Sequence, residues 1–160
     1  MISIHVSEII ERPIDEVFAF AGCFDNDSAW RTGLSARWPI ISGSPVEHMP
    51  FQETVTYLGN QFTFQGIIEA VEADARVTFR STNATMPMWG QRLFEPVGNH
   101  TYFTYELTIE PTGTYELLPT LTSELFTRLI RHDVAALKQL LESRNLASHK
   151  HMGDMELAMA

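Results

Sequence analysis

The sequence predicts an α+β fold, in which a curved antiparallel sheet of about seven strands wraps around one long C-terminal helix. Apolar residues recur at three- and four-residue steps over residues 120–143, which is the spacing of a helix that buries one face. Before that segment, most of the chain alternates apolar and polar residues, as strands with one buried face do. Helical features are otherwise confined to two short helices expected after the first strand.

The first strand is expected over residues 2–11, where isoleucine and valine alternate with polar residues. Pro13 ends this strand and suits the first position of a helix. Acidic residues follow it, where they complement the helix dipole. The capping residues over 25–28 predict a second short helix that carries Trp30.

A meander of antiparallel strands is expected in the middle of the chain. Gly59 and Asn60 form a hairpin-type turn between two alternating segments. Prolines at 39, 45 and 50 make residues 34–41 a weaker strand candidate. The clearer strands are expected over residues 52–58, 62–71, 76–81, 88–95 and 101–110.

The long helix is expected over residues 120–143 and would be about 36 Å long. Pro119 disfavours a helix interior, so either the helix begins there or residues 115–118 form a separate turn. Residues 147–160 lack clear periodicity and are predicted to be a flexible tail. Residues 1–146 are predicted to form a single domain, because no linker or repeat divides them.

Composition excludes several classes of protein. The 160-residue chain has a net charge of −9, so the basic surface typical of a nucleic-acid partner is not expected. Cys23 is the single cysteine, which excludes an intrachain disulfide and fits a cytoplasmic location. The N-terminus does not read as a signal peptide, and no apolar run approaches the length of a membrane span.

A sheet cannot close tightly on a helix along its whole length, so a cavity between them is expected, and such clefts bind small molecules. Several segments resemble the START-like superfamily, also called SRPBCC, helix-grip or Bet v 1-like, and within it the polyketide cyclase/dehydrase-type group. The resemblance covers about residues 3–144. It is carried by Ile10-Glu11-Arg12-Pro13, Val17-Phe18, Asp25 to Trp30, Gly66 to Glu72, Phe94 to Gly98 with Thr101, Tyr105-Glu106-Leu107, Pro111-Thr112-Gly113 and Leu129 to Glu142.

The resemblance implies a deep hydrophobic pocket, in a family whose members bind lipids, sterols, hormones and polyketides. It supplies no short catalytic motif, so no catalytic residue is carried over by position. The leading hypothesis is that the protein binds a small hydrophobic molecule. If it is an enzyme, it is expected to cyclise, aromatise or dehydrate a polyketide-like substrate. A non-catalytic carrier or sensor and a protein-interaction co-regulator are the alternatives. No cofactor is expected, and both a monomer and a homodimer remain open.

Three charged residues are candidates for catalysis. Asp133 lies within the apolar stripe of the long helix, either as a satisfied carboxylate or as a general acid or base with a pKa raised by burial. Arg92 lies on a strand whose two faces both carry aromatic residues, so it is either solvated or aimed inward to stabilise an oxyanion. Glu8 falls on the apolar parity of the first strand, although strand ends often expose such residues.

The candidates for ligand binding are apolar and aromatic residues of the expected cavity wall, for which plain core packing is the alternative role. They are Trp30, Tyr57, Phe64, Trp89, Tyr105, Leu125, Leu129 and Leu137. No metal site is expected, because the His149 and His151 pair lies in a tail that offers no fixed frame.

Overall fold

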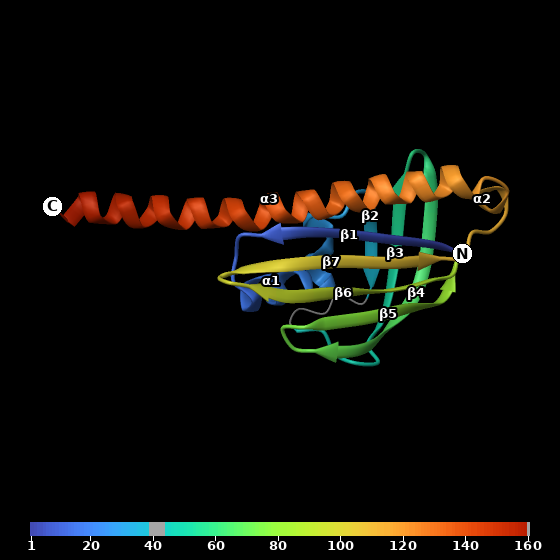
Figure 1. The fold of residues 1–160 in the computed structure, drawn as a ribbon, viewed down its shortest axis with the longest axis horizontal. Coiled ribbons are helices and arrows are strands. Elements are labelled where there is room, and N and C mark those ends of the chain that lie inside the picture. Colours follow the sequence, from blue (N-terminus) through green and yellow to red (C-terminus); the bar gives the residue numbers. More distant parts are fainter. Residues whose placement is uncertain (39–43, 160) are drawn as a thin grey trace.

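The computed structural model describes the backbone of residues 1–38 and 44–159, and the side chains of 1–35 and 44–144. Seven antiparallel strands form one curved sheet in the order β1-β7-β6-β5-β4-β3-β2, and a long helix, α3, runs beside it (Figure 1). The predicted fold class and strand number are confirmed. The strands are β1 (Ile2–Ile10), β2 (Leu34–Trp38), β3 (Pro50–Tyr57), β4 (Asn60–Glu72), β5 (Arg76–Ala84), β6 (Met88–Val97) and β7 (His100–Ile109).

Alternating burial shows that the strands have one covered face and one open face. In β1, Ile2, Ile4 and Val6 are buried while the residues between them are exposed. The β3–β4 hairpin turns through Leu58 and Gly59, which both have positive φ. Because side chains alternate along a strand with a period of two, the buried residues of β1 and of β3 to β7 lie on the concave face.

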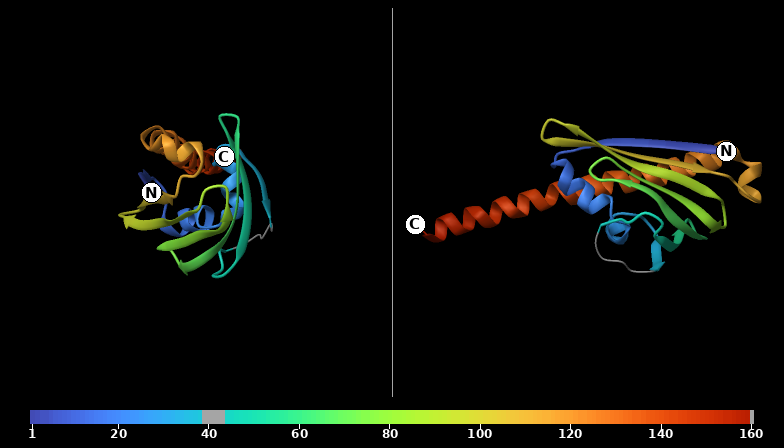
Figure 2. Two further views of the ribbon diagram at one scale, coloured as in Figure 1. Left: turned by 90° about the vertical axis from the view of Figure 1, so that its right-hand side faces the viewer. Right: turned by 90° about the horizontal axis from the view of Figure 1, so that it is seen from below.

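Two short helices follow β1, as predicted, and they lie on the concave side of the sheet (Figure 2). They are the α-helix α1 (Ile14–Ala21) and the 3-10 helix η1 (Phe24–Ala29). Phe18 of α1 packs edge-on against Phe94 of β6, with 5.0 Å between ring centroids. This contact anchors α1 on the sheet and places η1 over its centre.

Helix α3 (Pro119–Met159) packs along β1 and buries the predicted apolar stripe from Phe126 onward, whereas Leu121 at the start of that stripe is 59% exposed. Lys138 donates to the carbonyl oxygen of Ile9 and to Glu142, and Glu142 accepts from the backbone N–H of Glu11. These bonds fix the helix against the end of β1. The buried residues of the stripe are Phe126, Leu129, Ile130, Val134, Leu137 and Leu141.

The boundaries of the C-terminal elements differ from the prediction. Residues Thr114–Leu117 form a separate short helix, α2, and α3 begins at Pro119. The predicted end of the helix at residue 143 is wrong, because the backbone stays helical to Met159 and this part projects beyond the sheet (Figure 1). After Pro119 no proline interrupts the segment, so nothing in the backbone chemistry forces a stop there. Flexibility of residues 147–160 stays a prediction.

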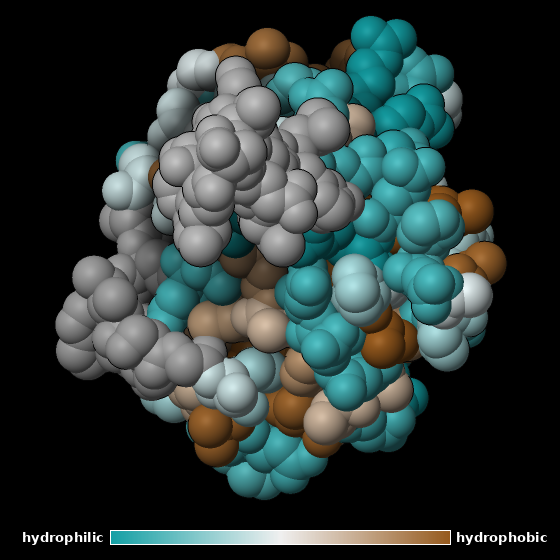
Figure 3. Space-filling view, turned by 90° about the vertical axis from the view of Figure 1, so that its left-hand side faces the viewer, coloured by the Kyte–Doolittle hydropathy of each residue, from teal (hydrophilic) through white to brown (hydrophobic). Residues whose placement is uncertain are grey.

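The surface at the end of the molecule from which α3 projects is mainly hydrophilic, with hydrophobic residues interspersed (Figure 3). Within the described part of the chain, no helix is both long and apolar enough to cross a membrane. The uncertain strand candidate at 34–41 is confirmed for residues 34–38, and residues 39–41 lie outside the described backbone.

Candidate functional site

A cavity of about 50 Å³ lies between the concave face of the sheet and α3. Side chains of η1, of strands β3 to β7 and of α3 form its wall, so it is the space that the curved sheet and the helix leave between them. A volume of this size holds only a few water molecules. The lining residues are Phe24, Arg31, Phe51, Glu53, Val55, Phe62, Thr63, Phe64, Phe79, Thr85, Met86, Met88, Arg92, Tyr105, Leu107, Ile109, Phe126, Leu129 and Ile130.

Edge-to-face aromatic pairs build much of the wall. The Phe24 ring contacts the rings of Phe51 and Phe79, each with 5.5 Å between centroids, and Phe51 contacts Phe64 at 6.1 Å. Such pairs contribute about 0.5–1.5 kcal/mol each beyond the area they bury. The wall is therefore an interlocked apolar surface that η1 closes from one side.

Three aromatic rings meet near the beginning of α3. Phe62 of β4 contacts Tyr115 of α2 and Phe126 of α3, with 5.6 Å between centroids in both pairs. Phe62 and Phe126 also line the cavity, and Tyr115 is only partly buried. This cluster joins sheet and helices at one end of the cavity.

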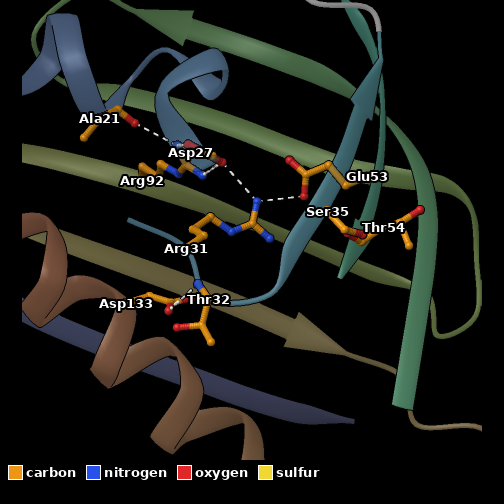
Figure 4. Close-up of polar contacts among 9 residues, drawn as sticks. All are labelled: Ala21, Asp27, Arg31, Thr32, Ser35, Glu53, Thr54, Arg92 and Asp133. Carbon is orange, nitrogen blue, oxygen red and sulfur yellow. Dashed lines mark hydrogen bonds and ion pairs between the residues drawn. The ribbon is translucent and has the colours of Figure 1, made fainter. Parts of the chain in front are cut away.

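A buried ion pair holds the opposite, polar end of the cavity. Arg92, on β6, is fully buried and donates to both carboxylate oxygens of Asp27 in η1, at 2.8 and 2.6 Å, and to the carbonyl oxygen of Ala21 at 2.8 Å (Figure 4). Its guanidinium carbon lies 4.0 Å from the centroid of the Phe24 ring. The arginine thus ties η1 and the end of α1 to the middle of the sheet.

Arg31 extends this pair into a network of four charges. Its Nη1 donates to Asp27 at 3.0 Å and to Glu53 of β3 at 2.7 Å (Figure 4). Two guanidinium groups and two carboxylates balance, so the network as a whole is neutral. Charges are tolerated in a protein interior when they are paired and hydrogen-bonded in this way.

The network keeps Asp27 and the two arginines charged and their tyrosine neighbour neutral. Burial alone would raise the pKa of Asp27, but the guanidiniums of Arg92 and Arg31 outweigh burial and lower it. Burial raises the pKa of Tyr105, which lies opposite Arg92 in the β6–β7 register, and the two arginines offset this only in part. At neutral pH, therefore, the Tyr105 hydroxyl keeps its proton and can donate a hydrogen bond.

Three buried polar atoms near this end have no hydrogen-bond partner among the described residues. They are Oε1 of Glu53, Nε of Arg92 and Nε1 of Trp30. Glu53 and Arg92 line the cavity, whereas Trp30 lies outside its lining and packs edge-on against Tyr105. Buried polar atoms are usually bonded, so each of these needs an explanation.

Asp133, a predicted catalytic residue, is buried on α3 but lies outside the cavity lining. It accepts a hydrogen bond from the backbone N–H of Thr32 at 2.8 Å. Burial raises its pKa, and the bond from Thr32 and the charge of Arg31 oppose this only in part. Gly33 follows with φ of 74°, a conformation that favours glycine and turns the chain from Thr32 into β2. Asp133 thus fastens α3 to this turn.

The structure divides the predicted site residues into three groups. The first group lines the cavity: Phe64, Arg92, Tyr105 and Leu129. The second is buried or partly buried outside the lining: Glu8, Trp30, Tyr57, Leu125, Asp133 and Leu137. The third group is Trp89 alone, and the prediction that it lies in the cavity wall was wrong. Its side chain is 39% exposed on the outer face of the sheet, because the other face of β6 carries the buried Met88, Arg92 and Phe94. Any role of these residues in catalysis or ligand binding stays a prediction.

Three residues of the polar end were not among the predicted ones: Asp27, Arg31 and Glu53. A signal for Glu53 was present, since it shares a strand parity with Phe51 and Val55 and is the charged residue of that apolar face. Asp27 was interpreted only as a capping residue, and Arg31 lies in a turn without periodicity. Their pairing depends on contacts across the fold.

Among the described residues, no group of three or more His, Cys, Asp or Glu side chains could hold a metal ion. The side chains of His149 and His151 lie outside the described part.

Comparison with known proteins gives a family and a fold. The family model for polyketide cyclase / dehydrase and lipid transport matches residues 1–142. No curated protein matches the sequence. Among solved structures, TTHA0849 from Thermus thermophilus is 16% identical, with a TM-score of 0.76 over 89% of this chain and 98% of that one.

Two further structures have the same fold at low identity. The Zhui aromatase/cyclase from Streptomyces sp. R1128 is 13% identical, with a TM-score of 0.71 over 89% of this chain and 94% of that one. A START superfamily protein from Mycobacterium smegmatis is 13% identical, with a TM-score of 0.71 over 88% and 97%. At these identities the likeness concerns the fold.

Proposed function

We propose that the chain, which belongs to the polyketide cyclase / dehydrase and lipid transport family, binds one small and largely apolar molecule between its sheet and α3. The cavity carries this proposal: its wall is mainly aromatic and aliphatic, and its charged groups, Arg31, Glu53 and Arg92, gather at one end. An apolar body with one polar group complements such a surface.

The size of the cavity sets a condition on the ligand. About 50 Å³ is far below the 300–1,000 Å³ of typical ligand pockets, so a ligand with two or more rings requires wall side chains to move. Phe62 and Phe126, which Tyr115 covers from α2, are the part of the wall that we expect to separate. Helix α2 is only four residues long, and Leu117 and Leu118 at its end are exposed.

A second proposal is that the protein converts its ligand, by cyclising or dehydrating a polyketide-like substrate. The observation that favours it is that Glu53, which has a carboxylate oxygen without a partner among the described residues, and Tyr105, whose hydroxyl is protonated, line the same cavity. A proton acceptor and a proton donor are the groups that an enolisation or dehydration step requires. Turnover of a poly-β-keto substrate by the wild-type protein, lost in Tyr105→Phe, would support this proposal.

Binding is tested by titrating 2-methoxynaphthalene, a neutral apolar probe, and following amide chemical shifts. Saturable shifts at the cavity-lining residues are expected. Leu129→Trp, which fills the cavity from α3, should weaken binding about tenfold or more, because overpacking a filled site costs about 1–3 kcal/mol. Leu121→Trp is the matched control, since Leu121 lies on the same helix and is 59% exposed. Shifts scattered outside the cavity, or equal affinities for the two variants, would contradict the proposal.

A further inference from the structure

Glu53 is a charged residue built into the apolar face of β3. It pairs with Phe64 in the β3–β4 register, and both side chains line the cavity. Only 1% of Glu53 is exposed, so it is buried as deeply as the aromatic residues around it. Its position in the wall therefore calls for a partner for each of its oxygens.

One carboxylate oxygen is satisfied and the other is not. Oε2 accepts a hydrogen bond from Nη1 of Arg31 at 2.7 Å and forms an ion pair with it. Oε1 is buried and has no hydrogen-bond partner among the described residues. Because an ionised carboxylate only accepts hydrogen bonds, the group that completes this oxygen must be a donor.

The other two unpartnered atoms make weaker demands on a ligand. The guanidinium of Arg92 faces the rings of Phe24, Trp30 and Tyr105 within 4.0–5.3 Å, and cation–π attraction satisfies part of its charge. Trp30 lies outside the cavity lining, so its indole N–H does not meet the cavity wall. The free acceptor of Glu53 is therefore the clearest polar feature that a ligand would meet.

Charge balance adds a second constraint. Arg92 is matched by Asp27, and Arg31 is shared between Asp27 and Glu53, so the network has no surplus positive charge for an anionic ligand. A ligand carboxylate placed beside Glu53 would put two like charges in a poorly solvated site, which is unfavourable. The polar end thus suits a neutral group.

We infer that the ligand carries a neutral hydrogen-bond donor, an alcohol, phenol or enol hydroxyl, that binds Oε1 of Glu53, and that the site rejects carboxylates of the same shape. This inference rests on the proposed binding function and names the class of molecule that the site selects. Tyr105 lines the same cavity and has a neutral hydroxyl, from which we expect a second contact to an oxygen of the ligand. Glu53 is then a specificity-determining residue.

The test compares three probes with one ring system on the wild-type protein at neutral pH: 2-naphthol, 2-methoxynaphthalene and 2-naphthoate. Dissociation constants are measured by NMR titration. A hydrogen bond to a charged acceptor predicts that 2-naphthol binds about tenfold to a hundredfold more tightly than 2-methoxynaphthalene, which lacks the donor. The anion 2-naphthoate should bind most weakly of the three.

A pair of variants assigns the preference to Glu53. Glu53→Gln removes the charge with almost no change of shape, and should reduce the preference for 2-naphthol about fivefold or more while improving 2-naphthoate. Glu69→Gln is the matched control, because Glu69 pairs with Arg80 at 2.6 Å on the exposed face of the sheet. It should keep the wild-type order of the three probes.

Each outcome decides a separate question. Equal affinities for 2-naphthol and 2-methoxynaphthalene, or tightest binding of 2-naphthoate, would overturn the inference and leave the binding function standing. Failure of all three probes to bind would overturn the binding function itself. If Glu53→Gln does not fold, the wild-type order of affinities is sufficient to decide the inference.

Discussion

Replacing Arg92 by methionine should strongly destabilise the protein. The side chain is fully buried, and its guanidinium donates to both carboxylate oxygens of Asp27 and to the carbonyl oxygen of Ala21. Methionine fills most of the same space but leaves Asp27 with Arg31 as its remaining cation. Breaking a buried ion pair in this way costs about 3–5 kcal/mol, because one charge stays buried without full compensation.

The assay is urea unfolding at neutral pH, with the free energy of unfolding extrapolated to zero denaturant and the slope compared between variants. Arg80→Met is the matched control. Arg80 forms a hydrogen-bonded ion pair with Glu69 at 2.6 Å, but the two side chains are 48% and 43% exposed. Exposed pairs contribute about 0–1 kcal/mol, so this variant should remain close to the wild type.

A double variant separates the pair from its surroundings. Arg92→Met combined with Asp27→Leu removes both charges of the pair, and Arg31 keeps Glu53 as its partner. The double variant should be less destabilised than the sum of the two single variants by about 0.5–3 kcal/mol. The reasoning is refuted if Arg92→Met costs no more than Arg80→Met, since the buried network would then contribute nothing that the exposed pair does not.

Two further predictions concern pH. The pKa of Asp27 is lowered below its ordinary value of 3.8 by Arg92 and Arg31 against the effect of burial, so its stabilising contribution is present above pH 3.8 and is lost as the pH falls through the folded-state pKa. Urea midpoints measured between about pH 5 and pH 3 should fall more steeply for the wild type than for Asp27→Asn, and parallel curves would contradict this. Burial raises the pKa of Asp133 above its ordinary value of 3.8, so the protonated carboxyl is favoured in the folded state. The stability that this group contributes is therefore fully present below pH 3.8 and is lost as the pH rises through the folded-state pKa. Asp133→Asn keeps an acceptor for the N–H of Thr32, so at about pH 7 its free energy of unfolding in urea should be at least that of the wild type. The difference between the two proteins should shrink toward about pH 4. If the variant instead loses more than about 1 kcal/mol of unfolding free energy at about pH 7, the charged carboxylate stabilises the fold and the prediction is wrong.

The sequence by itself determined the elements and most of their faces. The three- and four-residue spacing over residues 120–143 predicted the buried side of α3 from Phe126 to Leu141, where one helical face meets the sheet, but not that Leu121 is exposed. Alternation did the same for β1 and β4, where one parity is clearly apolar. The family resemblance then gave the arrangement of these elements, and the structure has that arrangement.

For β6 the sequence left the buried face open. Arg92 and Phe94 lie on one parity and Trp89 on the other, so the period of two is evident but its phase is not. The sheet decides the phase: Arg92 turns inward because Asp27 and the carbonyl oxygen of Ala21 lie there as acceptors. Trp89, the larger apolar side chain, is left on the outer face.

The polar end of the cavity was decided by tertiary structure alone. Arg92 and Asp27 are 65 residues apart in the chain, and Arg31 and Glu53 are 22 apart. Each of these residues has an ordinary local role in its own segment, as a cap, a turn residue or a strand residue. Ion pairing depends on distance in space, so no local pattern encodes it, and only the folding of η1 onto the sheet brings the four charges together.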